Sequence, residues 1–267
     1  MPHDQTDVEL ARDLAAKAGR LLVEFREAFG PVDPGDKPRL QQLRDGADRQ
    51  SHELIAAAIG AARPRDALLS EEGKDDEGRL SSDRVWIVDP LDGTWEYGQG
   101  RTDCGVHIAL WLSPTADAPG RLAATVVDLP AAGVVRTTAD PDPQLPPLAQ
   151  DRPWRVVVSR TRPPKDMDAI VVRWSALSGH DVEIVNVGSV GAKVEEILTG
   201  RAEAYLHNTG FYEWDLAAPM GVAQHYGLVI EHWDGSRIEL NQMPPFVRDV
   251  VVVRPELAAS LRQAIRS

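Results

Sequence analysis

The segment 86–100, WIVDPLDGTWEYGQG, limits most strongly what this chain can fold into. The apolar run 85–88 is typical of a strand that is buried on both faces. Asp89, Asp92 and Thr94 follow at once, so the strand has to end in a turn that carries carboxylates and a hydroxyl. Hard cations such as Mg²⁺ favour such oxygen-rich turns. The alternative is an ordinary strand-to-turn junction, since Asp-Pro and Asp-Gly are common turn dipeptides.

Length and composition indicate a globular protein. With 267 residues, 43% of them hydrophobic, the chain can form a substantial core in one large or two ordinary domains. It has no apolar segment long enough to span a bilayer and a single cysteine, Cys104, and its first residues lack the basic start and apolar middle expected of a secretory signal. We therefore expect a cytoplasmic protein without a membrane span or disulfide framework. The formal net charge of -12 opposes binding to nucleic acid polymers, but a phosphate ester can still bind through metal ions.

The first half of the sequence is typical of an α+β unit. Apolar residues at helical intervals predict a first helix that ends before Gly30, and a second helix from Asp48 to Pro64 after the polar loop 31–46. Five β-like segments follow: DALLS, RVWIV, CGVHIALWL, LAATVVDL and GVVRTT. We expect them to form one antiparallel sheet backed by both helices.

A proline-rich stretch, 139–153, lacks apolar periodicity and separates this half from the next. Beyond it, segments typical of strands and helices alternate, which favours an α/β unit. The predicted subdomains are 1–140 and 151–267.

The acidic turn resembles a sequence motif of a known family, which favours a metal site over an ordinary turn. DPLDGT resembles the DPxDGT signature of the inositol monophosphatase superfamily of metal-dependent phosphatases. Other family landmarks appear in the same order: Asp48 in ADRQSHELI, the pair Glu71-Glu72 after LLS, and EWD at 213–215. The resemblance covers most of the chain. It implies a layered α-β-α-β-α sandwich with the site where the two halves meet.

The resemblance also implies a division of roles. The implied metal ligands for two or three Mg²⁺ ions are Glu71, Asp89, the Leu91 carbonyl, Asp92 and Asp215. Asp89 would bridge two ions, which can activate water and neutralise a leaving oxygen. Thr94 and Asp48 would orient and deprotonate the water, with Asp45 as a rival to Asp48. The alternatives are a surface turn at 71–72, a helix cap at Asp48 and a helix N-terminal carboxylate at Asp215.

The substrate has to be inferred from the second half. VVVSRTRPP and EWD resemble the CysQ-type 3'(2'),5'-bisphosphate nucleotidases. Ser159 and Arg160 would meet a phosphate, and the turn 188–193 could bind a second phosphate at a helix start. The expected substrate-binding residues are Gly93, Thr94, Ser159, Arg160, Ser189, Lys193 and Asp215. The alternatives are solvated arginines on a surface loop and simple helix-start chemistry.

Some residues depart from the family pattern, and others are expected to have only a structural role. Pro219 stands where the family has glycine, Arg162 where histidine is usual, and His207 where an arginine often follows the strand. We expect His107 to be structural, because it lies in an alternating strand, and the tryptophans to pack in or around the core.

The resemblance implies a Mg²⁺-dependent phosphatase that removes the 3'-phosphate of 3'-phosphoadenosine 5'-phosphate to give AMP. The resemblance further implies that the enzyme also acts on the 5'-phosphosulfate analogue, serves sulfate assimilation, is inhibited by lithium and forms a homodimer. The alternatives are an inositol monophosphatase or fructose-1,6-bisphosphatase with the same metals, and a non-catalytic protein that binds metal or phosphate.

Overall fold

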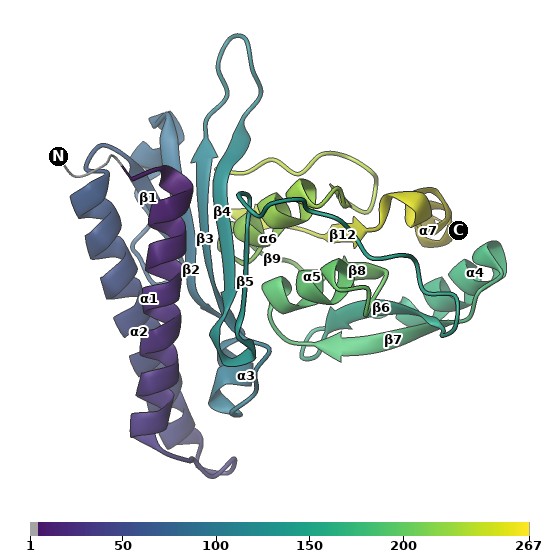
Figure 1. The fold of residues 1–267 in the computed structure, drawn as a ribbon, viewed down its shortest axis with the longest axis horizontal. Helices are drawn as coiled ribbons and strands as arrows, with labels where there is room; N and C mark the ends of the chain where they lie inside the picture. The colour runs from purple at the N-terminus through teal and green to yellow at the C-terminus, as the bar shows by residue number, and fades with distance from the viewer. Residues whose placement is uncertain (1–4, 267) are drawn as a thin grey trace.

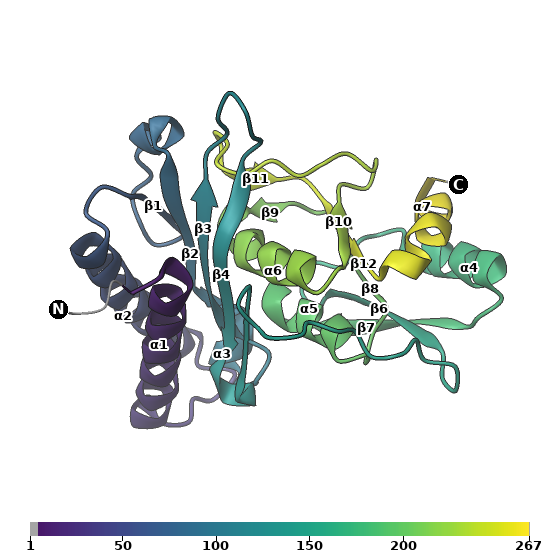
Figure 2. The same cartoon turned by 45° about the horizontal axis from the view of Figure 1, so that its top comes forward.

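The computed structural model describes residues 5–266 and arranges them in five layers (Figures 1 and 2). The helices are α1 (Asp7–Phe29), α2 (Lys37–Ala62), α3 (Thr94–Gly98), α4 (Met167–Ser178), α5 (Val190–Leu198), α6 (Glu213–His225) and α7 (Ala258–Arg266). Helices α1 and α2 cover one side of the first sheet, α5 and α6 lie between the sheets, and α4 and α7 cover the far side of the second sheet.

The outer helices α1 and α2 differ in how well the sequence predicts them. Helix α1 starts with the expected capping box of Thr6 and Glu9. The predicted start of α2 at Asp48 is wrong, because the helix already begins at Lys37 and only the preceding residues form a loop. Asp36 caps this start, and the many charged residues of the first turns hide the helical spacing of the buried Leu40, Leu43 and Ala47. Within residues 5–266, none of the helices is long and apolar enough to cross a membrane.

The first sheet has the strand order β1-β2-β3-β4-β5. Its strands are β1 (Ala67–Ser70), β2 (Arg84–Asp92), β3 (Gly105–Leu112), β4 (Arg121–Leu129) and β5 (Val134–Thr137). The expectation of a fully antiparallel sheet is wrong, because β1 pairs with β2 in parallel. The chain returns between them through a connection that contains the short 3₁₀ helix η1 (Glu77–Ser81), so both strands point toward the same end of the sheet.

The central strand β2 is buried on both faces, as its apolar run predicts. Trp86 and Val88 belong to the core formed with α1 and α2, whereas Val85 and Ile87 belong to the core on the opposite side. Helix α6 packs against β2, β3 and β4 on that second side. Asp89 follows Ile87 by two residues, so the alternation along β2 turns its side chain to this second side, which faces the second sheet.

The second sheet has the order β10-β12-β8-β6-β7. Its strands are β6 (Trp154–Ser159), β7 (Val182–Val187), β8 (Ala204–His207), β10 (Val229–Glu231) and β12 (Val250–Val253), and β9 (Phe211–Tyr212) pairs separately with β11 (Phe246–Val247). The largest hydrophobic cluster takes residues from both halves of the chain. The division into subdomains 1–140 and 151–267 stays a prediction.

Candidate active site

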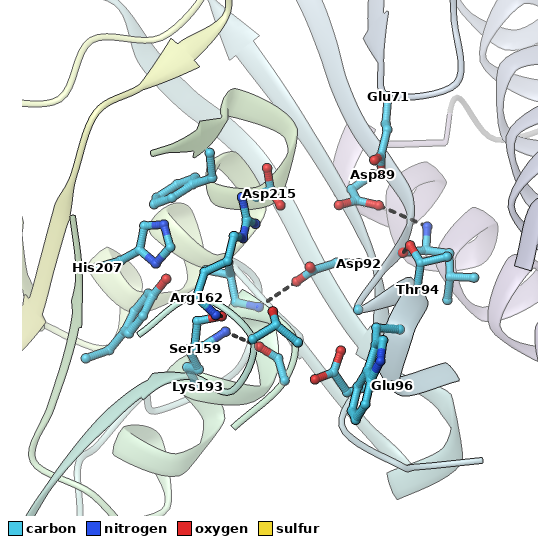
Figure 3. A pocket seen from close by; sticks show the side chains of 18 residues that line it. Glu71, Asp89, Asp92, Thr94, Glu96, Ser159, Arg162, Lys193, His207 and Asp215 are labelled. Atoms are coloured by element: carbon cyan, nitrogen blue, oxygen red, sulfur yellow. Dashed lines mark hydrogen bonds between the residues drawn. The ribbon is translucent and has the colours of Figure 1, made fainter. Parts of the chain in front are cut away.

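A cavity of about 200 Å³ lies at the carboxyl end of β2. Its lining comes from both halves of the chain, with β2 and α3 on one side and the ends of β6, β8 and α6 on the other (Figure 3). The lining residues are Glu71, Asp89, Leu91, Asp92, Gly93, Thr94, Trp95, Glu96, Ser159, Thr161, Arg162, Gly188, Val190, Lys193, Tyr205, His207, Phe211 and Asp215. All the predicted metal ligands are among them.

The end of β2 is shaped so that its carboxylates face this cavity. The pairing register with β3 shifts between Asp89 and Asp92. The backbone N–H of Leu91 donates to Asp89 Oδ1 at 3.0 Å, which folds the turn back on itself. Gly93 then takes a left-handed backbone conformation (φ 86°) that favours glycine, and Thr94 starts α3. The Thr94 hydroxyl donates to the Leu91 carbonyl at 3.2 Å.

Three carboxylates meet in the cavity. One oxygen each of Asp89, Asp92 and Asp215 lies within 4.8 Å of the others. Asp215 reaches them from the first turn of α6, and Figure 3 shows it on the opposite side of the cavity from Asp89. Glu71 points toward Asp89 from the end of β1, at the edge of the cavity.

Burial, together with the charges of neighbouring carboxylates, raises the pKa values of these groups. Burial, followed by the charges of Glu71 and Asp92, raises the pKa of Asp89 well above its usual range. Burial and Asp92 raise the pKa of Asp215 to about 7. Burial of the carboxyl and the charge of Asp92 likewise raise the pKa of Glu71 to about 7, although a hydrogen bond with Asp89 acts in the opposite direction.

The donor set fits hard divalent cations. Carboxylate oxygens from several strands and helices, together with the cavity-lining turn of Leu91 and Thr94, are the ligand types that Mg²⁺ prefers. Bound cations would also relieve the mutual repulsion that raises the carboxyl pKa values.

Asp48, rather than Asp45, is buried close to the acidic cluster, although it is not part of the cavity lining. Asp48 is buried on α2, and Ser51, one turn later on the same helix, donates to the Pro90 carbonyl at 2.8 Å. Burial and the charges of Glu71 and Glu72 raise the pKa of Asp48 to about 8. Asp45 is exposed and accepts a hydrogen bond from Gln41. The pairing of Asp48 with Thr94 stays a prediction.

Arg160 does not take the place expected of a phosphate-binding residue. Its guanidinium donates to Glu96 at 2.6 Å and to Asp103 at 2.7 Å, and it is not part of the cavity lining. Asp103 also accepts the backbone N–H of Gly188. Arg160 therefore connects the end of β6 to α3 and supports the cavity wall from behind. Sequence alone could not show this, because its acidic partners lie in the other half of the chain.

The two residues predicted from the turn 188–193 divide into one that lines the cavity and one that does not. The Ser189 hydroxyl accepts the backbone N–H of Ala192, so it caps α5 instead of facing the cavity. Lys193 is buried, lines the cavity and donates to the Gly188 carbonyl. Burial lowers the pKa of Lys193 to about 8, although Asp92 and Glu96 favour its charged form.

Several lining residues were not predicted as site residues. Arg162 extends toward Asp215 in Figure 3, although the sequence left it open as a surface arginine. Trp95 lines the cavity and is 42% exposed, so it is not one of the tryptophans that pack in the core. His207 also lines the cavity, and burial lowers its pKa to about 4. The one available signal for Trp95 was its position directly after the acidic motif.

Glu213 of the EWD motif is turned away from the cavity. It is fully buried and accepts the backbone N–H groups of Asn241 and Gln242 at 2.6 and 2.7 Å. Arg79, on the connection that follows Glu71, donates to the Asn241 side chain at 2.6 Å. Glu213 therefore helps to tie the Glu71 connection to the start of α6. This hydrogen-bond network connects the segment after Glu71 with the helix that carries Asp215, and both of these residues are predicted metal ligands.

Comparisons with known proteins agree with this architecture. The chain matches the inositol monophosphatase family over residues 3–267. A 3'-phosphoadenosine 5'-phosphate phosphatase of Mycobacterium leprae is 41% identical over 271 residues, which cover 98% of this chain and 94% of that protein. The CysQ 3'(2'),5'-bisphosphate nucleotidase of Shigella flexneri is 26% identical, with coverage of 88% and 94%.

A solved structure extends the comparison to the fold. An inositol monophosphatase from Zymomonas mobilis superposes with a TM-score of 0.72 at 19% identity and covers 98% of each chain. This likeness confirms the predicted layered α-β-α-β-α sandwich. Taken with the match along the sequence, it shows that the chain belongs to the inositol monophosphatase family.

Proposed function

We propose that this protein is a Mg²⁺-dependent phosphatase that hydrolyses the 3'-phosphate of 3'-phosphoadenosine 5'-phosphate to give AMP. The observation that carries the proposal is the convergence of Asp89, Asp92 and Asp215 on one cavity. The choice of substrate is supported by the 41% identity to the Mycobacterium leprae protein named for this activity.

In the proposed site, Glu71, Asp89 and the Leu91 carbonyl would hold one Mg²⁺ ion, and Asp89, Asp92 and Asp215 would hold a second. When bound, the ions would polarise the phosphoryl group and offset the negative charge that develops on the leaving oxygen. The carboxylates have to bind in their ionised form, so metal binding releases the protons that the raised pKa values retain.

The remaining residues act on water and substrate. Thr94 and Asp48 would orient the attacking water and accept its proton, since Asp48 is buried and its Oδ1 has no hydrogen-bond partner among residues 5–266. Gly93 and Ser159 line the cavity beside the expected position of the phosphate. Arg162 and Lys193 line the same cavity and supply positive charge for the phosphates.

The wider role follows from the resemblance. We propose a cytoplasmic homodimer that is inhibited by lithium, also accepts the 5'-phosphosulfate analogue and serves sulfate assimilation. Each of these properties stays a prediction.

A comparison of substrates tests the assignment. Initial rates with Mg²⁺ should be highest on 3'-phosphoadenosine 5'-phosphate, lower on inositol 1-phosphate and fructose 1,6-bisphosphate, and absent in EDTA. Equal efficiency on all three substrates would make the proposed specificity too narrow. Absence of phosphate release from any substrate, with intact metal binding, would favour the non-catalytic alternative.

A further inference from the structure

His107 lies beneath the acidic cluster rather than in an ordinary apolar environment. It is on β3, directly opposite Asp89 in the antiparallel register with β2, so both side chains point to the same face of the sheet. His107 is fully buried. Neither of its ring nitrogens forms a hydrogen bond of normal geometry with residues 5–266. A buried polar ring of this kind needs a partner or a function.

The nearest charged neighbour of the ring is a predicted metal ligand. His107 Nε2 lies 3.4 Å from Asp92 Oδ2. The same carboxylate oxygen accepts the backbone N–H of Val190, at the start of α5, at 2.5 Å. Oδ2 is therefore held from the protein side, which leaves Oδ1 of Asp92 for a ligand in the cavity.

The ring also lies beside the first turn of α6. Burial lowers the pKa of His107, while the charge of Asp92 and then the nearby backbone carbonyls of Asp215 and Trp214 act in the opposite direction. In a regular helix the Asp215 carbonyl would accept the N–H of residue 219. Pro219 has no N–H, so the Asp215 carbonyl lacks this helical partner. Helix α6 nevertheless continues through Pro219 to His225, and the proline stands beyond its first turn.

Gly191 provides the space for the ring. A Cβ atom at Gly191 would lie 2.5 Å from His107 Nε2 and 2.6 Å from a methyl group of Val127. Any larger residue at this position of α5 would force the imidazole or Val127 to move. Gly191, Pro219 and His107 belong to three different elements, and together they place one ring between Asp92 and the backbone of the first turn of α6.

We propose that His107 is a positioning residue that holds Asp92 and the first turn of α6, which carries Asp215, in the arrangement that binds metal. Pro219 contributes by keeping the Asp215 carbonyl free for the ring. Partners of this kind, one step removed from the metal, fix the orientation of its ligands. This inference rests on the metal assignment proposed above.

The test measures metal affinity directly. Free Mn²⁺ is quantified by electron paramagnetic resonance during titration of the wild type and of His107→Leu, His107→Gln and Pro219→Ala. His107→Leu removes the polar ring atoms at similar volume, and His107→Gln keeps an N–H group near the Nε2 position. Loss of an outer partner weakens metal binding about 10-fold to 100-fold, and we expect this for His107→Leu. We expect His107→Gln to recover most of the affinity and Pro219→Ala to lose part of it.

The melting temperature of each metal-free variant separates positioning from packing. A folded His107→Leu variant with wild-type Mn²⁺ affinity overturns the inference, even if its metal-free form melts at a lower temperature. If His107→Leu does not fold, wild-type Mn²⁺ affinity in a folded Pro219→Ala variant overturns the inference instead. If the wild type binds no Mn²⁺, the metal assignment of the proposed function is wrong. This outcome is distinguishable from a failure of the inference about His107, in which the wild type still binds Mn²⁺.

Discussion

Replacing Asp215 by asparagine should raise the stability of the metal-free protein and sharply reduce its stabilisation by metal. Two interpretations of Asp215 predict opposite changes in the free energy of unfolding when its charge is removed. As a carboxylate in the first turn of α6, it should stabilise the helix by about 0.3–1 kcal/mol, so its neutralisation should be unfavourable. As one of several buried carboxylates that repel one another when no cation is bound, it should destabilise the fold at neutral pH. Asparagine keeps an oxygen that can accept the Tyr212 N–H, which now bonds to Asp215 at 2.8 Å.

The size of the effect follows from the pKa. Burial and the charge of Asp92 raise the pKa of Asp215 from 3.8 to about 7. Between these two pH values the folded chain keeps a proton that the unfolded chain has lost, so stability falls as the pH rises through this window. A shift of this size costs the wild type at most about 4 kcal/mol above pH 7 and nothing near pH 4. The gain in Asp215→Asn should therefore appear at pH 8 and vanish near pH 4.

The assay is urea unfolding in EDTA at both pH values, followed by thermal melting at pH 8 with increasing Mg²⁺. Asp168→Asn is a matched control, because Asp168 is an exposed aspartate in the first turn of α4, outside the cavity. The wild type should gain about 2.7 kcal/mol when Mg²⁺ reaches 100 times its dissociation constant, and Asp215→Asn should gain far less. Destabilisation of metal-free Asp215→Asn at pH 8, similar to that of the control, would refute the reasoning.

Three further predictions concern the walls of the cavity. Arg160→Met should lower the free energy of unfolding by about 2–4 kcal/mol, because Glu96 and Asp103 lose a shared partner; a raised KM with unchanged urea unfolding would instead indicate direct substrate contact. Gly188→Ala should lower the free energy of unfolding by about 1–3 kcal/mol and reduce kcat/KM, because its Cβ would lie 2.5 Å from the Asp103 carbonyl oxygen. An unchanged kcat/KM would show that the surrounding residues can move to accommodate the methyl group. Cys104 should resist thiol reagents in the folded protein, because burial raises its pKa to about 12; rapid labelling without urea would contradict this.

The local sequence was sufficient where a short stretch determined its own conformation. The capping box of α1 involves residues three positions apart, and the apolar run of β2 reports burial without reference to any partner. The acidic motif at 89–94 likewise contains both its turn chemistry and its carboxylates. The start of α2 was missed, because charged side chains on its exposed face interrupt the apolar pattern.

Only the tertiary structure decided which polar residues face the cavity. Arg160 and Arg162 are two positions apart in one loop, yet Arg160 pairs with Glu96 and Asp103 while Arg162 lines the site. Likewise, the position of His107 in an alternating strand predicts burial but not contact with Asp92. The sequence by itself indicated most of the helices and strands and the carboxylates of the acidic turn, because hydrophobic spacing and turn propensity are properties of neighbouring residues. The tertiary structure decided which charges meet, because electrostatic energy depends on distances between segments that are remote along the chain.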